Sequence, residues 1–218
     1  MAELLAIGVT DEPAPTGDRP DLSVPETSAP GLASRLIEEG VASEAVVLST
    51  DRMTELYLVA EDGLTAEAAA LAELASCCGV CTSLLAGSVY ALEEEYVASH
   101  LFRIAAGVGG PPPYDVPMRG RVERAHRVAR DAGSAGPLLD RLFTDATEVA
   151  AGAPAGASAS GTPTAVDELE VRRWERRVAE EVERFSSWRY ETLDGELAPG
   201  SGETGASVLR FPRPGDAA

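Results

Sequence analysis

One stretch decides the fold of this chain: Val46-Val47-Leu48-Ser49-Thr50-Asp51-Arg52-Met53-Thr54-Glu55-Leu56-Tyr57-Leu58-Val59-Ala60. It contains two runs rich in Val, Leu and Tyr, and a short polar connection lies between them. Runs of this kind are typical of buried strands, so we predict two strands that meet at the connection. The polar side chains of the connection would then lie together at the joint.

The same patterns predict the other helices and strands. Residues 4–9 and 89–91 are predicted as strands, and helices are predicted over 27–37, 65–78, 93–107, 119–132 and 138–149. Thr65 is the expected N-cap of its helix, and Gly107 is expected to end the helix that precedes it. The predicted class is α/β (α+β), a small mixed sheet with flanking helices at one side.

The composition limits the classes of partner. The 218 residues carry a net charge of −18, and all 18 basic residues are Arg. A field of this sign repels polyanions, so nucleic-acid binding would need a local basic patch. The Arg bias, with abundant Ala, Gly and Pro, is typical of a GC-rich genome such as an actinobacterial one.

Membrane and export signals are not apparent in the sequence. No apolar run approaches the roughly 20 residues that cross a bilayer. The first residues lack the basic segment of a signal peptide, so we expect a cytoplasmic protein. Three Cys in such a chain are expected to be free thiols.

The chain divides into four parts by composition. Residues 1–150 are predicted to form one domain, and the Ala/Gly/Ser/Pro-rich residues 151–166 a flexible linker. Residues 167–193 are predicted to form a long amphipathic helix. The Gly/Pro/Ser-rich residues 194–218 are predicted to be a disordered tail.

Two motifs resemble the N-terminal catalytic domain of glutamyl-tRNA reductases. The joint matches that family's Ser-Thr-Cys-Asn-Arg-Thr-Glu segment in frame, through Ser49-Thr50 and Thr54-Glu55. The run from His100 to Gly107 is similar to the family's His-Leu-Phe-Arg helix. The resemblance extends over roughly residues 4 to 150 and implies the fold of that domain.

The chain departs from the family pattern where the chemistry lies. Asp51 stands at the position of the nucleophilic Cys, and a carboxylate cannot form the thioester that the family reduces. Met53 replaces the Arg that holds the substrate carboxylate, and Asp115-Val116-Pro117 replaces a Glu-Pro-Gln loop. A glycine-rich dinucleotide motif is also missing. The resemblance therefore implies a truncated, degenerate member that uses no NADPH.

A candidate pocket follows from the joint and the retained helix: Ser49, Thr50, Asp51, Arg52, Thr54 and His100. Asp51 has two interpretations. It fits a new acid/base or binding group, but a loop that has lost its function, in which Asp51 caps a turn, is slightly favoured. His100 fits a general acid/base, an axial metal ligand or an axial haem ligand. Cys77, Cys78 and Cys81 are weak metal candidates, since small buried residues at a helix end explain them better.

The basic residues concentrate on one predicted helix. Arg121, Arg124, Arg127 and Arg130 form a broad band there and are the candidates for tRNA binding. A solvated face that pairs with the abundant carboxylates is the alternative.

An apolar stripe on the last predicted helix needs a covering surface. Its members are Trp174, Val178, Val182, Phe185 and Trp188. They must pack on their own domain, on a second copy or on another protein, and a homodimer or partner contact is the favoured interpretation.

The sequence thus predicts a protein similar to glutamyl-tRNA reductase but without reductase activity. It would be a binding or regulatory component for aminoacyl-tRNA or for a tetrapyrrole-pathway partner. The alternative is a haem-binding protein, or an enzyme of specialised metabolism, that reuses the pocket around His100 and Asp51. No cofactor is expected under the first hypothesis.

Overall fold

The structure, a computed structural model, describes residues 2–10, 22–50, 53–85, 88–107, 118–154 and 165–193. Four strands, β1 (Glu3–Thr10), β2 (Glu44–Ser49), β3 (Met53–Ala60) and β4 (Val89–Glu93), form one sheet in the order β2-β3-β1-β4. The described helices are α1 (Ala29–Glu38), α2 (Gly63–Cys77), α3 (Thr82–Leu85), α4 (Glu95–Ala106), α5 (Arg119–Ala132), α6 (Pro137–Ala151) and α7 (Ala165–Leu193). The α/β class is confirmed.

The two strands of the deciding stretch form a hairpin at one edge of the sheet. β2 pairs with β3 from Glu44↔Val59 to Ser49↔Thr54, and the N–H of Thr50 donates to the carbonyl of Met53 at 2.8 Å. All three described strand pairings are antiparallel. The sheet is therefore antiparallel and not mixed. Only β2 and β3 form a hairpin, and each helical connection, through α1 and through α2 and α3, skips one strand, so that an antiparallel strand lies between the two strands it joins.

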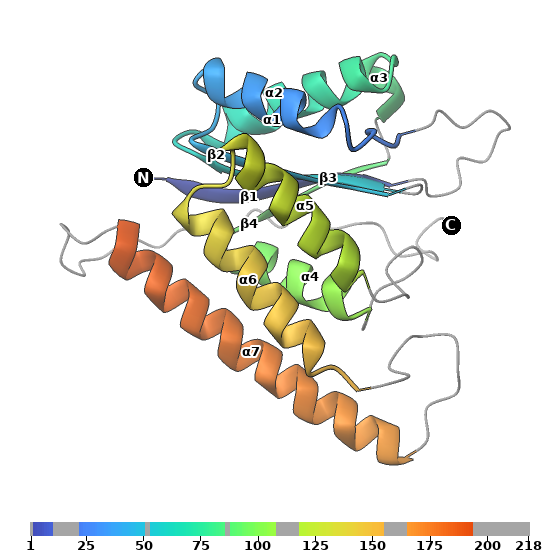
Figure 1. Ribbon diagram of the computed structural model, residues 1–218, viewed down its shortest axis with the longest axis vertical. Coiled ribbons are helices and arrows are strands. Elements are labelled where there is room, and N and C mark those ends of the chain that lie inside the picture. Colours follow the sequence, from blue (N-terminus) through green and yellow to red (C-terminus); the bar gives the residue numbers. More distant parts are fainter. Residues whose placement is uncertain are drawn as a thin grey trace, which may run out of the picture.

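Helices cover both faces of the sheet, whereas one side was predicted. In Figure 1, α1, α2 and α3 lie above the sheet, α4, α6 and α7 lie below it, and α5 passes in front of it. The period of two in β3 explains this arrangement. Leu56 and Leu58 point into the core on the α1/α2 side, and Tyr57 and Val59 point into the core on the α4/α6 side. β3 is buried along its whole length, since each of its faces meets a separate core.

Helix ends follow their capping residues. Asp62 is the N-cap of α2, and its carboxylate accepts a hydrogen bond from the N–H of Thr65. The prediction of Thr65 as the N-cap was wrong, because the Asp62 carboxylate caps the helix three residues earlier and so places Thr65 inside the first turn of α2. Gly107 ends α4 in the left-handed conformation, with φ of 69°, as predicted.

α7 lies on its own domain. It contacts α4 and α6, and the side chains of Trp174, Val178 and Phe185 are each at most 3% exposed. Val182 and Trp188 are partly buried and pack on the same core. The first of the three alternatives for the apolar stripe therefore accounts for its burial. Association through these residues stays a prediction.

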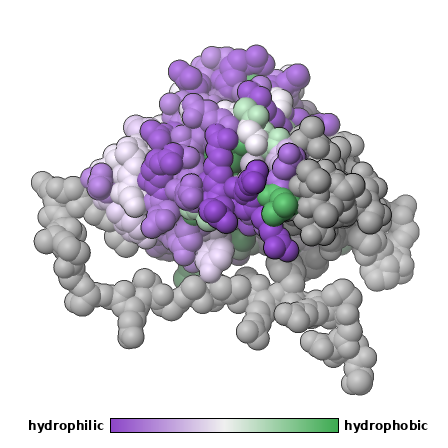
Figure 2. Space-filling view, turned by 90° about the horizontal axis from the view of Figure 1, so that it is seen from below, coloured by the Kyte–Doolittle hydropathy of each residue, from purple (hydrophilic) through white to green (hydrophobic). Residues whose placement is uncertain are grey.

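The outer surface of α7 is polar, as its amphipathic pattern predicts. Figure 2 views the molecule from the side of α7 and shows a largely hydrophilic surface. The exposed side chains of this helix include Arg172, Arg173, Arg176 and Arg177. Among the described residues, no helix is long and apolar enough to cross a membrane.

Candidate functional site

A buried carboxylate lies at the centre of the candidate site. Glu55 of β3 is fully buried and faces α4. Its Oε1 lies 2.7 Å from Nε2 of His100, and its Oε2 accepts a hydrogen bond of 2.5 Å from the Tyr57 hydroxyl. Tyr90 of β4 also donates its hydroxyl to Oε1. These four residues, Glu55, Tyr57, Tyr90 and His100, are called the Glu55 cluster below.

The Glu55 cluster depends on a glycine in the strand between its members. Gly8 of β1 pairs with Glu55 on one side and with Tyr90 on the other. A Cβ atom at Gly8 would overlap the ring of Tyr90. The absent side chain therefore lets the Tyr90 ring lie across β1 and reach the carboxylate two strands away.

The charge of Glu55 is stabilised by its neighbours. Burial by itself would raise the pKa of this carboxyl, since a charge loses its hydration. The positive imidazole of His100, and hydrogen bonds from His100, Tyr57 and Tyr90, outweigh burial and hold the pKa of Glu55 below its usual range. A carboxylate that accepts several hydrogen bonds is expected to remain ionised at neutral pH.

His100 connects this buried carboxylate to the outside of the molecule. Its side chain is 19% exposed, and its ring packs edge-on against Tyr90 at 5.7 Å between centroids. A carboxylate on one ring nitrogen fixes the orientation of an imidazole. The arrangement can therefore present a held imidazole, which is able to donate or accept a proton or to bind an anion.

The hydroxyls of the joint serve the backbone. The Ser49 Oγ accepts from the N–H of Val24 at 2.8 Å and bonds with the Thr54 hydroxyl, which itself donates to the carbonyl of Leu22 at 2.8 Å. The Thr50 hydroxyl accepts from the N–H of Met53 at 3.1 Å. These contacts hold the hairpin and residues 22–24 together.

The sheet separates the predicted pocket residues. Thr54 and Ser49 lie on the α1 side with Leu22, whereas the Glu55 cluster lies on the α4 side, because neighbouring residues of a strand point to opposite faces. The structure thus brings Ser49 and Thr54 together and places His100 with Glu55. Asp51, Arg52 and the loop of residues 115–117 lie outside the described residues.

The predicted tRNA-binding arginines lie on α5, and all four are exposed. Arg124 lies 3.5 Å from Glu26, with both side chains more than half exposed. Arg130 lies 3.3 Å from Asp140. Exposed ion pairs of this kind contribute about 0–1 kcal/mol to the free energy of folding, so a phosphate can replace the carboxylate as the partner of the arginine.

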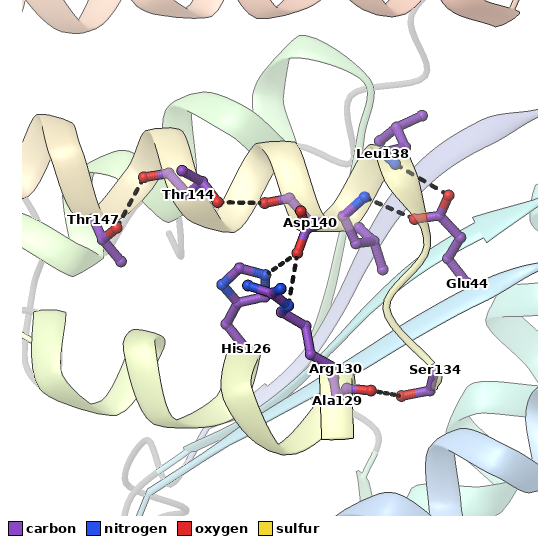
Figure 3. A network of polar contacts seen from close by, with 10 residues as sticks. Glu44, His126, Ala129, Arg130, Ser134, Leu138, Asp140, Thr144 and Thr147 are labelled. Atoms are coloured by element: carbon purple, nitrogen blue, oxygen red, sulfur yellow. Dashed lines mark hydrogen bonds and ion pairs between the residues drawn. The ribbon is translucent and has the colours of Figure 1, made fainter. Parts of the chain in front are cut away.

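A second polar network joins α5, α6 and β2 (Figure 3). Nε2 of His126 lies 2.8 Å from Asp140. Glu44 accepts hydrogen bonds from the amides of Leu138 and Leu139, at 3.1 and 2.7 Å, and so caps α6. Burial raises the pKa of Glu44 although these amides oppose the shift. This network fixes helices and holds no free cavity-lining group.

The cysteines do not assemble into a metal site. No group of three or more metal-ligating side chains occurs among the residues described. Cys77 and Cys78 are half-buried beside the core, and the guanidinium of Arg35 lies 3.4 Å from the Cys77 sulfur. The guanidinium of Arg35 is a cation beside the Cys77 sulfur, so it would compete with a metal ion for this ligand. The exposed Cys81 contacts the Ser83 hydroxyl.

Glu55, Tyr57 and Tyr90 were absent from the sequence-based candidates. A charged residue inside an apolar strand, Glu55 in ELYLVA, was the available signal, since an unpaired buried carboxylate is costly. Nothing in the sequence paired it with Tyr90, because that contact depends on the register of three strands.

Comparisons with known proteins point to one family. The family model "Glutamyl-tRNAGlu reductase, N-terminal domain" matches residues 7–154. The glutamyl-tRNA reductase of Geobacillus kaustophilus is 28% identical over 211 residues, which are 95% of this chain and 46% of that protein. The enzyme of Frankia casuarinae is 33% identical over 146 residues, 67% of this chain and 31% of that one.

The chain spans a third to about half of the length of these relatives. Among solved structures, glutamyl-tRNA reductase from Methanopyrus kandleri aligns with a TM-score of 0.48 and 19% identity. This alignment covers 68% of the present chain and 33% of that one.

Proposed function

This chain belongs to the family of the glutamyl-tRNA reductase N-terminal domain, and from that premise we propose that it binds an aminoacyl-tRNA without reducing it. It would serve as a binding or regulatory component. Asp51 carries this proposal, because it stands where the family has its nucleophilic Cys. A carboxylate is a weak acyl acceptor and cannot give a thioester for hydride transfer.

The residues around the β2–β3 hairpin support a retained binding role and not a loss of all function at this site. The hydroxyls of Ser49 and Thr54 hold the hairpin, and the Glu55 cluster is fully assembled behind it. A buried carboxylate persists only where partners offset its desolvation, which costs several kcal/mol per ion. The cluster therefore keeps His100 in a fixed place at the edge of the candidate site.

The proposed contact with RNA lies on α5. Arg121, Arg124 and Arg127 are exposed there, and the ion pair of Arg124 with the exposed Glu26 is one that a phosphate can replace. Each phosphate contact adds close to one unit to the salt dependence of binding. We therefore expect the affinity to fall as salt rises through these contacts, while salt also screens the repulsion between RNA and a chain of net charge −18.

Filter binding with charged and uncharged tRNA at moderate salt tests this function. We expect retention of tRNA by the full chain, and a loss of about tenfold when Arg121, Arg124 and Arg127 are changed to Ala. Arg184→Ala on α7 is the matched control, since this exposed Arg belongs to another surface. Absence of binding, or equal binding by the triple variant, would refute the RNA proposal.

The reductase side of the proposal has its own assay. We expect no NADPH consumption with glutamyl-tRNA, and none after Asp51→Cys, because Met53 still replaces the Arg that the family uses for the substrate carboxylate. Recovery of turnover by Asp51→Cys alone would show that a single exchange inactivated a complete site.

The haem alternative has less support. Nε2 of His100 is bound to Glu55, so an axial bond through that atom would leave the buried carboxylate without its cationic partner. A haem titration followed by absorption spectroscopy decides the point. A Soret band that disappears in His100→Ala would establish the alternative.

A further inference from the structure

A groove runs along the free edge of the sheet, between α1 and α5. It has a volume of about 520 Å³. Its floor is formed by Val47, Leu48 and Ser49 of β2, and its walls include Glu26 before α1 and Arg121 and Arg124 of α5. α1 packs on one face of the sheet and α5 joins the core of the other, so the edge of β2 lies between them.

The backbone of β2 offers hydrogen bonds to this groove. In an antiparallel pair, alternate residues direct both N–H and C=O away from the neighbouring strand. The N–H of Thr50 bonds to the carbonyl of Met53 on the neighbouring strand β3. The backbone N–H and C=O groups of the odd-numbered residues of β2 therefore face away from β3. Ala45 agrees, because its N–H donates outward to the carbonyl of Ser134 at 2.8 Å.

The next two outward positions are open. Within the described part of the chain, the structure records no hydrogen bond to the amides of Val47 or Ser49. An open strand edge is a template for pairing with another extended chain. The contact between Ala45 and the α5–α6 connection closes one end of this edge, so only a short segment fits.

The side chains around the edge define the chemistry of the occupant. Val24, Ala125 and Val128 add apolar surface, and Arg121 and Arg124 supply two positive groups on one wall. Glu26 is the acidic group opposite and already pairs with Arg124. An extended peptide with carboxylates on one side and apolar side chains on the other matches this arrangement.

We propose that this groove binds a short, acidic, extended peptide segment of a partner protein, which adds as a fifth strand beside β2. Its backbone would pair with Val47 and Ser49, and alternate carboxylates would meet Arg121 and Arg124. At a rise of about 3.3 Å per residue, roughly four or five residues would be held. This interaction goes beyond the proposed RNA binding and does not require it.

Selection from a random peptide library displayed on phage, with the full chain as bait, tests the proposal. We expect enriched peptides with Asp or Glu at every second position and few basic residues. Their affinity is then measured by fluorescence anisotropy. Failure to enrich any peptide, or enrichment of basic or proline-rich ones, would overturn the proposal.

Backbone methylation of an enriched peptide tests the pairing itself. N-methyl groups placed one at a time should weaken binding by about tenfold at alternate residues and little at the residues between them, because only every second amide faces β2. Binding that is insensitive to methylation, or without this alternation, would rule out strand addition. Deuterium exchange should also slow at Val47 and Ser49 on binding.

Charge reversal on α5 locates the site. We expect Arg121→Glu with Arg124→Glu to weaken peptide binding by about tenfold or more. Arg127→Glu is the matched control, since Arg127 lies on the same helix but does not line the groove. Equal losses in both variants would place the peptide elsewhere. A single-stranded RNA that protects Val47 and Ser49 while no peptide does would assign the groove to RNA.

Discussion

Glu55 and His100 are 45 residues apart in the chain, and their side chains meet with Oε1 and Nε2 2.7 Å apart. The carboxylate is fully buried, whereas the imidazole remains partly exposed. The pair therefore links the inside of the sheet to the surface.

The first prediction concerns Gly8→Ala. The new methyl group would overlap the Tyr90 ring, so Tyr90 must move and Glu55 loses a hydrogen bond. We expect the free energy of unfolding to fall by about 1–3 kcal/mol in urea titrations. Gly120→Ala is the matched control. A Cβ there meets nothing within 4 Å, and Ala favours the helix. Equal stability of the two variants would contradict the role of Gly8.

The second prediction concerns pH. The folded-state pKa of Glu55 is lowered, so its stabilisation is complete above the unfolded value of about 4.3 and is lost as the pH falls through the folded value. His100→Gln removes the cationic partner. We expect a loss of about 3–5 kcal/mol at neutral pH, and the difference from wild type should shrink below about pH 4.

The measurement for this prediction is urea unfolding at several pH values. His126→Gln is the control, because its partner Asp140 is 44% exposed and the pair is therefore better solvated. A difference between wild type and His100→Gln that does not change with acid pH would mean that Glu55 is not the titrating group.

The third prediction concerns the end of α7. Arg189 is 5% exposed and binds both carboxylate oxygens of Glu94 as well as the carbonyl of Ala2, the last at 2.8 Å. Glu94 has a φ of 56°, a strained conformation for a residue with a side chain. Arg189→Met leaves this carboxylate without its cation, and we expect a loss of about 2–4 kcal/mol.

Hydrogen exchange localises that effect. In Arg189→Met, the last turns of α7 and the start of α4 should exchange faster than in wild type. Arg119→Met removes an ion pair with Glu123 in which both side chains are exposed, and it should change stability by less than about 1 kcal/mol. Uniform acceleration of the whole chain would indicate global destabilisation and not release of α7.

The fourth prediction concerns Glu44, which accepts the first amides of α6. Glu44→Gln keeps one acceptor oxygen and removes a buried charge, whereas Glu44→Ala leaves both amides without their acceptor. We expect Ala to cost about 1–2 kcal/mol and Gln clearly less. Thermal unfolding of both variants checks the order, which the reverse result would contradict.

The elements of the fold could be predicted because they depend on local patterns. The hairpin follows from the apolar runs on either side of Thr50, and Gly107 marks the end of α4. Which helices cover which face of the sheet could not be predicted, since this depends on the core that each helix joins. The amphipathic stripe of α7 was visible, but its periodicity does not identify the covering surface.

The site could be predicted only in part. The family resemblance identified His100, and the structure adds Glu55 as its partner. Ser49 and Thr54 were expected in a pocket, yet their hydroxyls bind Val24 and Leu22 on the opposite face. Residue type gave no indication of this, because a Ser or Thr at a strand end serves a ligand or the backbone equally well.

The fate of the aminoacyl ester distinguishes binding of the substrate from its reduction. Radiolabelled glutamyl-tRNA is incubated with an excess of the full chain and NADPH, and the label is then recovered from protein-bound tRNA and from small molecules. We predict that the label stays esterified to bound tRNA and that no aldehyde forms. Release of the label as the aldehyde would contradict the claim that this chain binds the substrate of its family without reducing it.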